Sequence, residues 1–561
     1  VSVERDGVQI DNSRFVSAGG NALRIDDVSA TVSDSSFSAN GGDGIQIDVD
    51  RPAQATDNVV TVSGCRFERN GGAVISSHPN AVLRQSGNLV SGPGMEPQTN
   101  KVNGIRILNG DITRPITWQA GTLPYVVADK ATIDVVRGSV RDSEGRLQAS
   151  MLTIEPGTVV KMGSDSTVIN TGGALQVGPA VDGTTGLYDT TANPVLITSL
   201  LDDACDASAG SSGCDTGSDG PSQPRPGSWR QLEFAGAGRS TVAATVLRYG
   251  GSLGGRGAAI VIRHDKDEVR GTEVAFSEGA AIFITQVAAA FVTDSKLHDN
   301  LRGGIRAEAS TTQGLKLFLS GNTISDNAGP AIDTDANVAV VLDTIDRAAG
   351  DTGNPAKPNT LQRNAIDGVA VHGTVNVDRT WEPVGLNYYV TDDVTLAFGK
   401  TLTLKPGVQV RFRNTSLICA TGTRIVAVRT AEQPVVLTSY NADGTDMQPG
   451  PGDWTGLVLS GCIAANDPST CSRLEHVQIR YTGGAGSRQD PAVKVTASGA
   501  TIANTLIELG TGDGIHFDNA GGKATDNLIR KMSGDGISIR ASGSGLINPD
   551  LSRTRVEDSR G

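Results

Sequence analysis

The chain has 561 residues, 70 of them glycine, with only 4% aromatic residues and a formal net charge of −13 at pH 7. This acidic balance argues against nucleic acid as a partner, and no apolar run approaches the roughly 18 residues of a membrane span. Short runs of Val, Ile and Leu, separated by Gly, Asn, Asp, Ser and Thr, indicate many short strands and almost no amphipathic helix.

The first 110 residues repeat a short apolar strand at intervals of 22 residues. "NALRID" (21–26) returns as "DGIQID" (43–48), and Phe15 is followed by Phe37 at the same interval. In each copy alternate residues are apolar, which places one face of the strand inside and the other outside. A repeat near 22 residues, built from short strands and Gly/Asn turns, is typical of one coil of a parallel β-helix.

The segment 199–221 is the strongest candidate for binding chemistry. It crowds carboxylates onto a Gly-rich backbone, and oxygen ligands of this kind suit Ca²⁺, which takes six to eight of them. The alternative is a solvated acidic insertion. The expected ligands are Asp202, Asp203, Asp206, Asp215 and Asp219.

A sparser version of this loop occurs at 441–453, where the expected calcium ligands are Asp443, Asp446 and Asp453.

Four cysteines lie in two loops with identical spacing, and we expect disulfides between Cys205 and Cys214 and between Cys462 and Cys471. Zinc binding would need more thiols or nearby histidines. Local disulfides predict an extracellular or cell-surface setting. The remaining two, Cys65 and Cys419, lie in apolar strand patterns and are expected to be buried small hydrophobes.

The 22-residue repeat recurs later in the chain, as "AIVI" (259–262) with "AIFI" (281–284) and as "GIHF" (514–517) with "GISI" (536–539). The expected inward ladder is Leu23, Ile45, Ile260, Ile282, Ile305, Val493, Ile515 and Ile537. Several strands are followed by an asparagine, which tolerates left-handed turns and hydrogen-bonds to backbone, so we expect a stacked corner. Its members are Asn40, Asn70, Asn300, Asn327 and Asn364.

A longer repeat of about 250 residues lies over the short one. "LTIEPGTVV" (152–160) matches "LTLKPGVQV" (402–410), and "PGSW" (226–229) matches "PGDW" (451–454). All four tryptophans fall at two repeated positions, Trp118 with Trp381 and Trp229 with Trp454, which favours packing over sugar-stacking platforms. We expect the tail of a preceding module in residues 1–110, a complete module in 111–376 and an incomplete second module in 377–561.

The stretch "TGDGIHFDNAGG" (511–522) brings together Asp513, His516 and Asp518, a set that could serve acid/base chemistry. The residue at the position of His516 varies freely between coils, so we expect ordinary outward positions of one coil. Its equivalents are Arg24, Gln46, Phe283, Arg306, Lys494 and Ser538.

The succession of "LTIEPGTVV", "NPVLITS", an Asp-Asp loop, "PGSW" and Gly/Asn-rich coils resembles bacterial secreted right-handed β-helix surface proteins, which are adhesin-like. The resemblance covers nearly the whole chain. It implies an all-β fold, an elongated right-handed parallel β-helix with inserted Gly/Asp-rich loops. Because that fold also carries pectate lyases, polygalacturonases and alginate epimerases, the resemblance implies no single activity.

Module repetition favours an extracellular structural or adhesive protein, a stalk, sheath or filament component, over an enzyme. The chain begins without Met or an apolar leader, so we expect a mature or excised segment that contacts neighbouring modules or copies of itself end to end. Surface glycans are further expected partners. The alternative is a polysaccharide lyase, hydrolase or epimerase. His372 is the nearest to a hydrolase motif, but its strand has no paired Asp-Asp one coil before it.

Overall fold

The structure is a computed structural model. It describes residues 1–49, 58–90, 99–138, 149–180, 189, 192–203, 215–220, 222–310, 313–342, 357–428, 432–443, 448–460, 462–464, 467–484, 489–496, 498–542 and 547–560. The regular secondary structure of these residues is short β-strands joined by turns, with only two short 3₁₀ helices among the described residues, η2 (Tyr440–Asp443) and η3 (Pro468–Thr470). Within the described residues, no helix is both long and apolar enough to cross a membrane.

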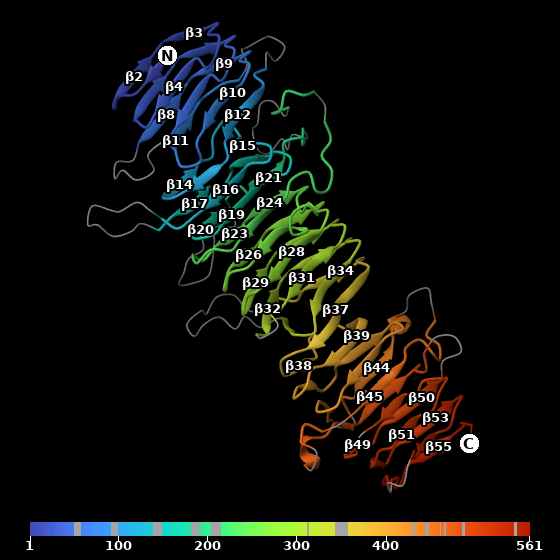
Figure 1. Ribbon diagram of the computed structural model, residues 1–561. Coiled ribbons are helices and arrows are strands. Elements are labelled where there is room, and N and C mark those ends of the chain that lie inside the picture. Colours follow the sequence, from blue (N-terminus) through green and yellow to red (C-terminus); the bar gives the residue numbers. More distant parts are fainter. Residues whose placement is uncertain are drawn as a thin grey trace. The chain divides into compact units, whose positions relative to one another are not determined.

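The chain forms two compact units, coloured in sequence order in Figure 1. The first comprises Val1–Ile305, Phe318–Gly329 and Asp343–Asn364, and the second comprises Arg306–Leu317, Pro330–Leu342 and Ala365–Gly561.

In the first unit, one sheet of thirteen strands takes one strand from each successive coil. Its strands are β1 (Ser2–Val3), β4 (Leu23–Asp26), β7 (Ile45–Asp48), β10 (Ala73–Ser77), β12 (Val102–Ile107), β15 (Tyr125–Val127), β18 (Val159–Met162), β21 (Val195–Ser199), β24 (Thr245–Arg248), β27 (Glu273–Ala275), β30 (Lys296–His298), β33 (Thr323–Ser325) and β36 (Thr360–Gln362).

The other faces of the first unit are parallel ladders of the same kind. One holds β13 (Gly110–Ile112), β16 (Thr132–Val135), β19 (Thr167–Asn170), β22 (Gln231–Phe234), β25 (Ala258–Ile262) and β28 (Ala280–Thr285). Another holds β14 (Pro115–Trp118), β17 (Met151–Ile154), β20 (Ala174–Val177), β23 (Thr241–Ala243), β26 (Glu268–Arg270) and β29 (Ala289–Thr293). The N-terminal coils add β2 (Val8–Asp11), β5 (Ala30–Ser33), β8 (Val59–Ser63) and β11 (Val82–Ser86), and β3 (Arg14–Val16), β6 (Ser36–Ser38) and β9 (Arg66–Glu68).

The second unit repeats the three-faced coil. From β34 (Pro330–Asp335), β37 (Ile366–Val375) and β39 (Tyr388–Leu396), two parallel ladders diverge. One holds β41 (Gln409–Phe412), β44 (Val435–Ser439), β47 (Val477–Arg480), β50 (Leu506–Gly510), β53 (Leu528–Met532) and β55 (Arg555–Glu557). The other holds β42 (Ser416–Cys419), β45 (Gly456–Leu459), β48 (Val493–Val495), β51 (Ile515–Asp518) and β54 (Ile537–Arg540).

The third face of the second unit holds β38 (Arg379–Trp381), β40 (Thr401–Leu404), β43 (Arg424–Ala427), β46 (Arg473–Glu475), β49 (Ala500–Ala503) and β52 (Gly522–Thr525). The remaining strands are β31 (Gly303–Glu308), β32 (Leu315–Ser320) and β35 (Val338–Leu342).

The expected inward ladders lie in register. Leu23 pairs with Ile45, and Ile260 pairs with Ile282. All eight expected ladder positions carry apolar side chains, and all except Ile537 are buried. The expectation of about 22 residues per coil is too uniform, because Ile45 pairs with Ile75, which is 30 positions later. Insertions between strands lengthen individual coils without disturbing the ladder.

The asparagine corner is present, and it works by amide-to-amide hydrogen bonds. Asn40 Nδ2 donates to Asn70 Oδ1 at 2.8 Å, and Asn327 Nδ2 donates to Asn364 Oδ1 at 2.7 Å. The left-handed backbone is one residue earlier than expected, at Ala39, for example, where φ is 55°. The asparagines themselves turn inward, and Asn40, Asn70, Asn300 and Asn327 are at most 2% exposed.

The four tryptophans pack rather than present platforms. Trp118 and Trp381 are each 2% exposed and stack on Tyr125 and Tyr388, with ring centroids 5.1 and 5.0 Å apart. The indole N–H groups of Trp229 and Trp454 donate at 2.8 and 2.7 Å to the carbonyls of Arg248 and Arg480. Each pair of repeated tryptophans therefore makes the same kind of contact in both copies.

Asp267 is a buried carboxylate that the sequence did not bring to notice. Its side chain is 0% exposed, and Oδ1 accepts a 2.8 Å bond from the Ser240 amide and faces His264 Nδ1 at 3.2 Å. Burial raises the pKa of Asp267 to about 6, opposed by the smaller lowering effects of Ser240, His264 and Arg239.

Removing one member of the asparagine corner should destabilise the fold. Asn327→Ala is expected to lower the free energy of unfolding by about 2 kcal/mol, because its buried partners lose their hydrogen bonds. Urea denaturation measures this. Gln9→Ala, at an exposed position of β2, is the control and should change it by less than about 0.5 kcal/mol. Equal losses for both variants would contradict the proposed role of the corner.

Asp267 should make the free energy of unfolding depend on pH. Its pKa in the folded chain lies above its ordinary value of about 4, so the folded state is penalised above pH 6 and relieved as pH falls from 6 to 4. Relative to Asp267→Asn, the wild-type free energy of unfolding should rise across this interval by up to about 1.4 kcal/mol per pH unit. Parallel urea titrations at several pH values test it; superimposable pH profiles would show that Asp267 does not titrate in this way.

Candidate metal centre

The acidic segment connects β21 to β22, and its described parts are its two ends. Asp202 and Asp203 follow β21, while residues 215–220 return toward β22. Asp206 and both cysteines of the expected first disulfide, Cys205 and Cys214, lie outside the described residues.

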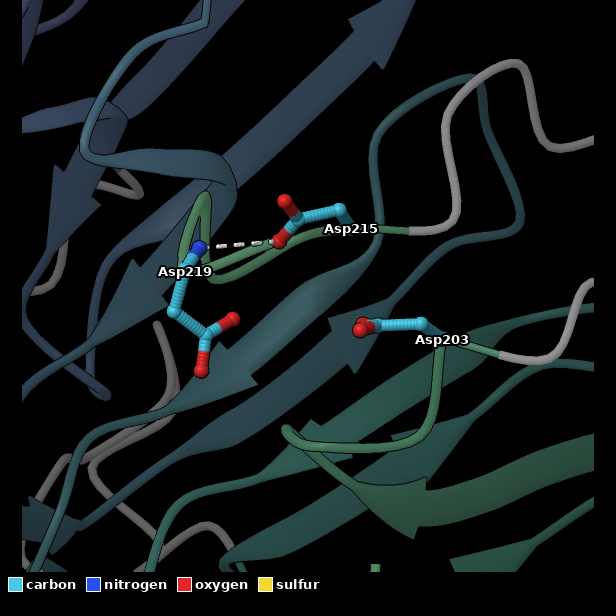
Figure 2. Close-up of side chains that lie close together, drawn as sticks. All are labelled: Asp203, Asp215 and Asp219. Atoms are coloured by element: carbon cyan, nitrogen blue, oxygen red, sulfur yellow. Dashed lines mark hydrogen bonds between the residues drawn. The ribbon is translucent and has the colours of Figure 1, made fainter. Parts of the chain in front are cut away.

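Three of the expected ligands meet. Asp203, Asp215 and Asp219 each offer a carboxylate oxygen, and these oxygens lie within 4.8 Å of one another (Figure 2). The two oxygens of Asp215 accept bonds from the amides of Asp219 and Gly220, at 3.1 and 2.9 Å. Those two bonds fold residues 215–220 into a tight turn that brings Asp219 beside Asp215.

The two carboxylate oxygens of Asp203 differ in their contacts with the described residues. Its Oδ2 accepts bonds from the amide and the hydroxyl of Ser222, at 2.7 and 2.8 Å. Its Oδ1 is shielded from solvent and has no hydrogen-bond partner among the described residues. A buried carboxylate oxygen without a donor is unfavourable unless a cation neutralises it.

The electrostatics of the group favour a cation. The pKa of Asp219 is raised, first by desolvation and then by the negative charges of Asp215 and Asp203. Lys161 is buried, with 6% of its surface exposed. Its ammonium group donates to the backbone carbonyl of Asp202 and, among the described residues, not to a carboxylate of the group. Burial lowers the pKa of Lys161, against the opposing effect of Asp202 and Asp203. The oxygen donors fit calcium, which favours hard oxygen ligands in flexible geometry.

Asp202 does not belong to this group. Its carboxylate is 5% exposed and accepts a 2.5 Å bond from the Thr198 hydroxyl, and its amide donates to the Ser199 carbonyl. The residue closes the turn after β21, so the expectation that all five aspartates converge is not met by Asp202.

The second acidic loop uses its described carboxylate differently. Asp453 Oδ2 accepts bonds from Asn441 Nδ2 at 3.2 Å and from the Gly450 amide at 3.0 Å, and also from the Ser439 hydroxyl. Asp453 thus holds its own loop together. Asp446 and the side chain of Asp443 lie outside the described residues.

Of the cysteines, Cys462 and Cys471 form a disulfide, and Cys65 and Cys419 are free and buried. Both observations agree with the sequence.

His516 occupies an outward position of a coil, in register with Lys494 in the coil before and Ser538 in the coil after. Its Nδ1 lies 2.6 Å from the Ser538 hydroxyl, which in turn contacts Asp513. The imidazole Nδ1 also lies 3.7 Å from Asp513 Oδ2, and the bonds to Ser538 connect two successive coils. This placement agrees with the expectation that His516 lies at an ordinary outward position of one coil.

A second titratable cluster escaped sequence reasoning. In the register of the parallel strands, Asp335 on β34 lies opposite His372 on β37. Asp333 Oδ1, on the same strand, lies 3.6 Å from His372 Nε2. The coil before His372 contains no adjacent Asp-Asp pair, but it does contain two aspartates separated by Thr334. They were missed because this coil spans 37 residues, from Asp335 to His372, and not 22.

Desolvation raises the pKa of Asp333, and the charges of Glu308 and Asp392 raise it further, while His372 and Arg306 lower it. The pKa of Asp335 is also raised by burial, although the amides of Asn337 and Ala309 donate to its carboxylate at 2.6 and 2.7 Å.

Two comparisons with protein families match parts of the chain. Residues 1–112 are similar to a family described as a right handed beta helix region, and residues 373–494 to a pectate-lyase like beta helix domain. No curated protein matches the chain. With the parallel ladders, these matches establish a right-handed parallel β-helix.

Proposed function

We propose that this chain is an extracellular structural or adhesive β-helix of a bacterial cell surface, in which the segment between β21 and β22 binds calcium. The observation that carries the calcium site is the meeting of Asp203, Asp215 and Asp219, where Asp203 Oδ1 has no donor among the described residues. The Cys462–Cys471 disulfide supports the extracellular setting.

The structural or adhesive role is supported by repetition. Trp229 and Trp454 occupy equivalent positions and donate to equivalent carbonyls, so the same packing element is used in each copy. Repeated units of this kind suit a protein whose partners are neighbouring modules, further copies end to end or surface glycans.

Calcium would be held by Asp203, Asp215 and Asp219 and would neutralise carboxylates that otherwise raise one another's pKa. In the bound form it would connect the end of β21 with residues 215–220. Its effect is therefore expected on stability, because an ion that binds only the folded state stabilises it by mass action.

Calcium should raise the stability of the wild-type chain and not that of Asp203→Asn/Asp219→Asn. With a dissociation constant of about 0.1 mM, typical of extracellular sites, 5 mM Ca²⁺ should add about 2 kcal/mol. Isothermal titration and thermal unfolding measure both quantities.

The matched control is Asp165→Asn, whose carboxylate is exposed and only weakly paired with Arg230, and it should retain the calcium response. A wild-type chain whose melting temperature and titration heat ignore Ca²⁺ would refute the site.

A polysaccharide lyase, hydrolase or epimerase is the second candidate, favoured by the contact between Asp333 and His372 and by the pectate-lyase-like match from residue 373. A carboxyl whose pKa is raised is the kind of group that can serve as the general acid for a leaving sugar oxygen.

If the chain cleaves acidic polysaccharides, Asp333→Asn should reduce turnover at least about 100-fold. Reducing-end and unsaturated-product assays, run with added Ca²⁺, measure this. Asp535→Asn, an exposed carboxylate elsewhere in the second unit, should leave turnover unchanged. Turnover unaffected by Asp333→Asn would remove this residue from the reaction.

A further inference from the structure

The returning arm of the acidic segment, residues 215–220, is docked on a residue far away in sequence. Asn103, in β12, donates through Nδ2 to the carbonyl of Asp215 at 3.2 Å, across 112 residues, and to the hydroxyl of Ser218 at 2.9 Å. Its backbone amide donates at 2.9 Å to the carbonyl of Thr216, whose side chain is 2% exposed. Three bonds from one residue therefore fix the arm that carries Asp215 and Asp219.

Asn103 is also the last member of an asparagine ladder. Asn40 Nδ2 donates to Asn70 and Asn70 Nδ2 donates to Asn100, at 2.8 and 2.7 Å. Asn100 then donates to Asn103 Oδ1 from its amide at 3.0 Å and from Nδ2 at 3.2 Å.

These two bonds copy the pattern of the coils below, where the amide and Nδ2 of Asn70 both donate to Asn100 Oδ1. Asn103 thus takes the place that the asparagine of a following coil would occupy. The Ser218 hydroxyl adds a bond to the carbonyl of Asn100, so the arm contacts the ladder directly as well.

We propose that Asn103 is the positioning residue of the acidic segment: it docks residues 215–220 onto the end of the asparagine ladder and so brings Asp215 and Asp219 to Asp203. The docking itself consists of hydrogen bonds within the folded chain and requires no bound ion. Its consequence for calcium rests on the proposed function, since the ion would bind an arm that is already ordered.

Preorganisation gives the expected size of the effect. An arm that must be ordered by the ion itself binds it more weakly, because part of the binding free energy is consumed in ordering the chain. Losing the Asn103 side chain should weaken calcium binding about tenfold, the equivalent of roughly one or two hydrogen bonds. Ser218→Ala removes a docking hydroxyl and leaves the Asn103 side chain in place, so it should act in the same direction.

The test compares Asn103→Ala and Ser218→Ala with Asn327→Ala. Asn327 makes the same ladder bonds with Asn300 and Asn364, and none of its hydrogen bonds among the described residues reaches 215–220, so it reports loss of ladder stability alone. Two quantities are measured on the full chain: hydrogen exchange of residues 215–220 without calcium, and the affinity for Ca²⁺ by isothermal titration.

Faster exchange of 215–220 in Asn103→Ala and Ser218→Ala, but not in Asn327→Ala, would support the docking, and weaker Ca²⁺ binding in the same two variants would support the coupling. Unchanged exchange in both would overturn the proposal. Faster exchange with unchanged Ca²⁺ affinity would overturn the coupling. A wild-type chain that binds no Ca²⁺ would refute the proposed calcium site, while the exchange data would still decide the docking.

Discussion

The fixed distance between successive coils is the constraint on which the rest of the molecule depends. Parallel strands in a ladder lie about 4.8 Å apart, so an inward side chain rests directly on its equivalent in the next coil. The inward positions therefore suit residues whose side chains can stack on, or hydrogen-bond to, an identical side chain in the next coil. The rings of Phe15, Phe37 and Phe67 stack at 4.8 and 4.9 Å, and an amide can donate to the amide above while accepting from the one below.

Insertions between strands leave the ladder intact. The two copies of the repeat of about 250 residues carry an insertion at the same position, after β21 and after β44, and its contacts differ between them. Lys161 and Arg411 occupy equivalent positions, each paired with a threonine of the next coil. In the first copy Lys161 bonds to the backbone of a segment whose carboxylates face one another. In the second, Tyr440 packs edge-on against Tyr389. Equivalent loops have thus acquired a candidate cation site in one place and an aromatic contact in the other.

Features that repeat at short range were predictable from the sequence, and features that depend on insertion length were not. The inward pairing of Val493 with Ile515 follows from periodicity alone. Asp333 and His372 are neighbours although the chain between them contains an insertion, whose length no 22-residue pattern discloses. For the acidic segment, composition identified the three converging carboxylates but could not separate Asp202, which differs by its contact with Thr198.

A ladder of side-chain amides leaves N–H donors without an acceptor at its end, because no further coil supplies the next asparagine. Asn103 supplies that acceptor to Asn100 from within the same turn, and its own amide group must then find partners outside the ladder. The arm 215–220 provides them through Asp215 and Ser218. The acidic segment therefore completes the hydrogen bonding of the coils, and the coils hold its carboxylates in place. An insertion placed where a ladder ends can in this way become ordered, although it contributes no strand of its own within the described residues.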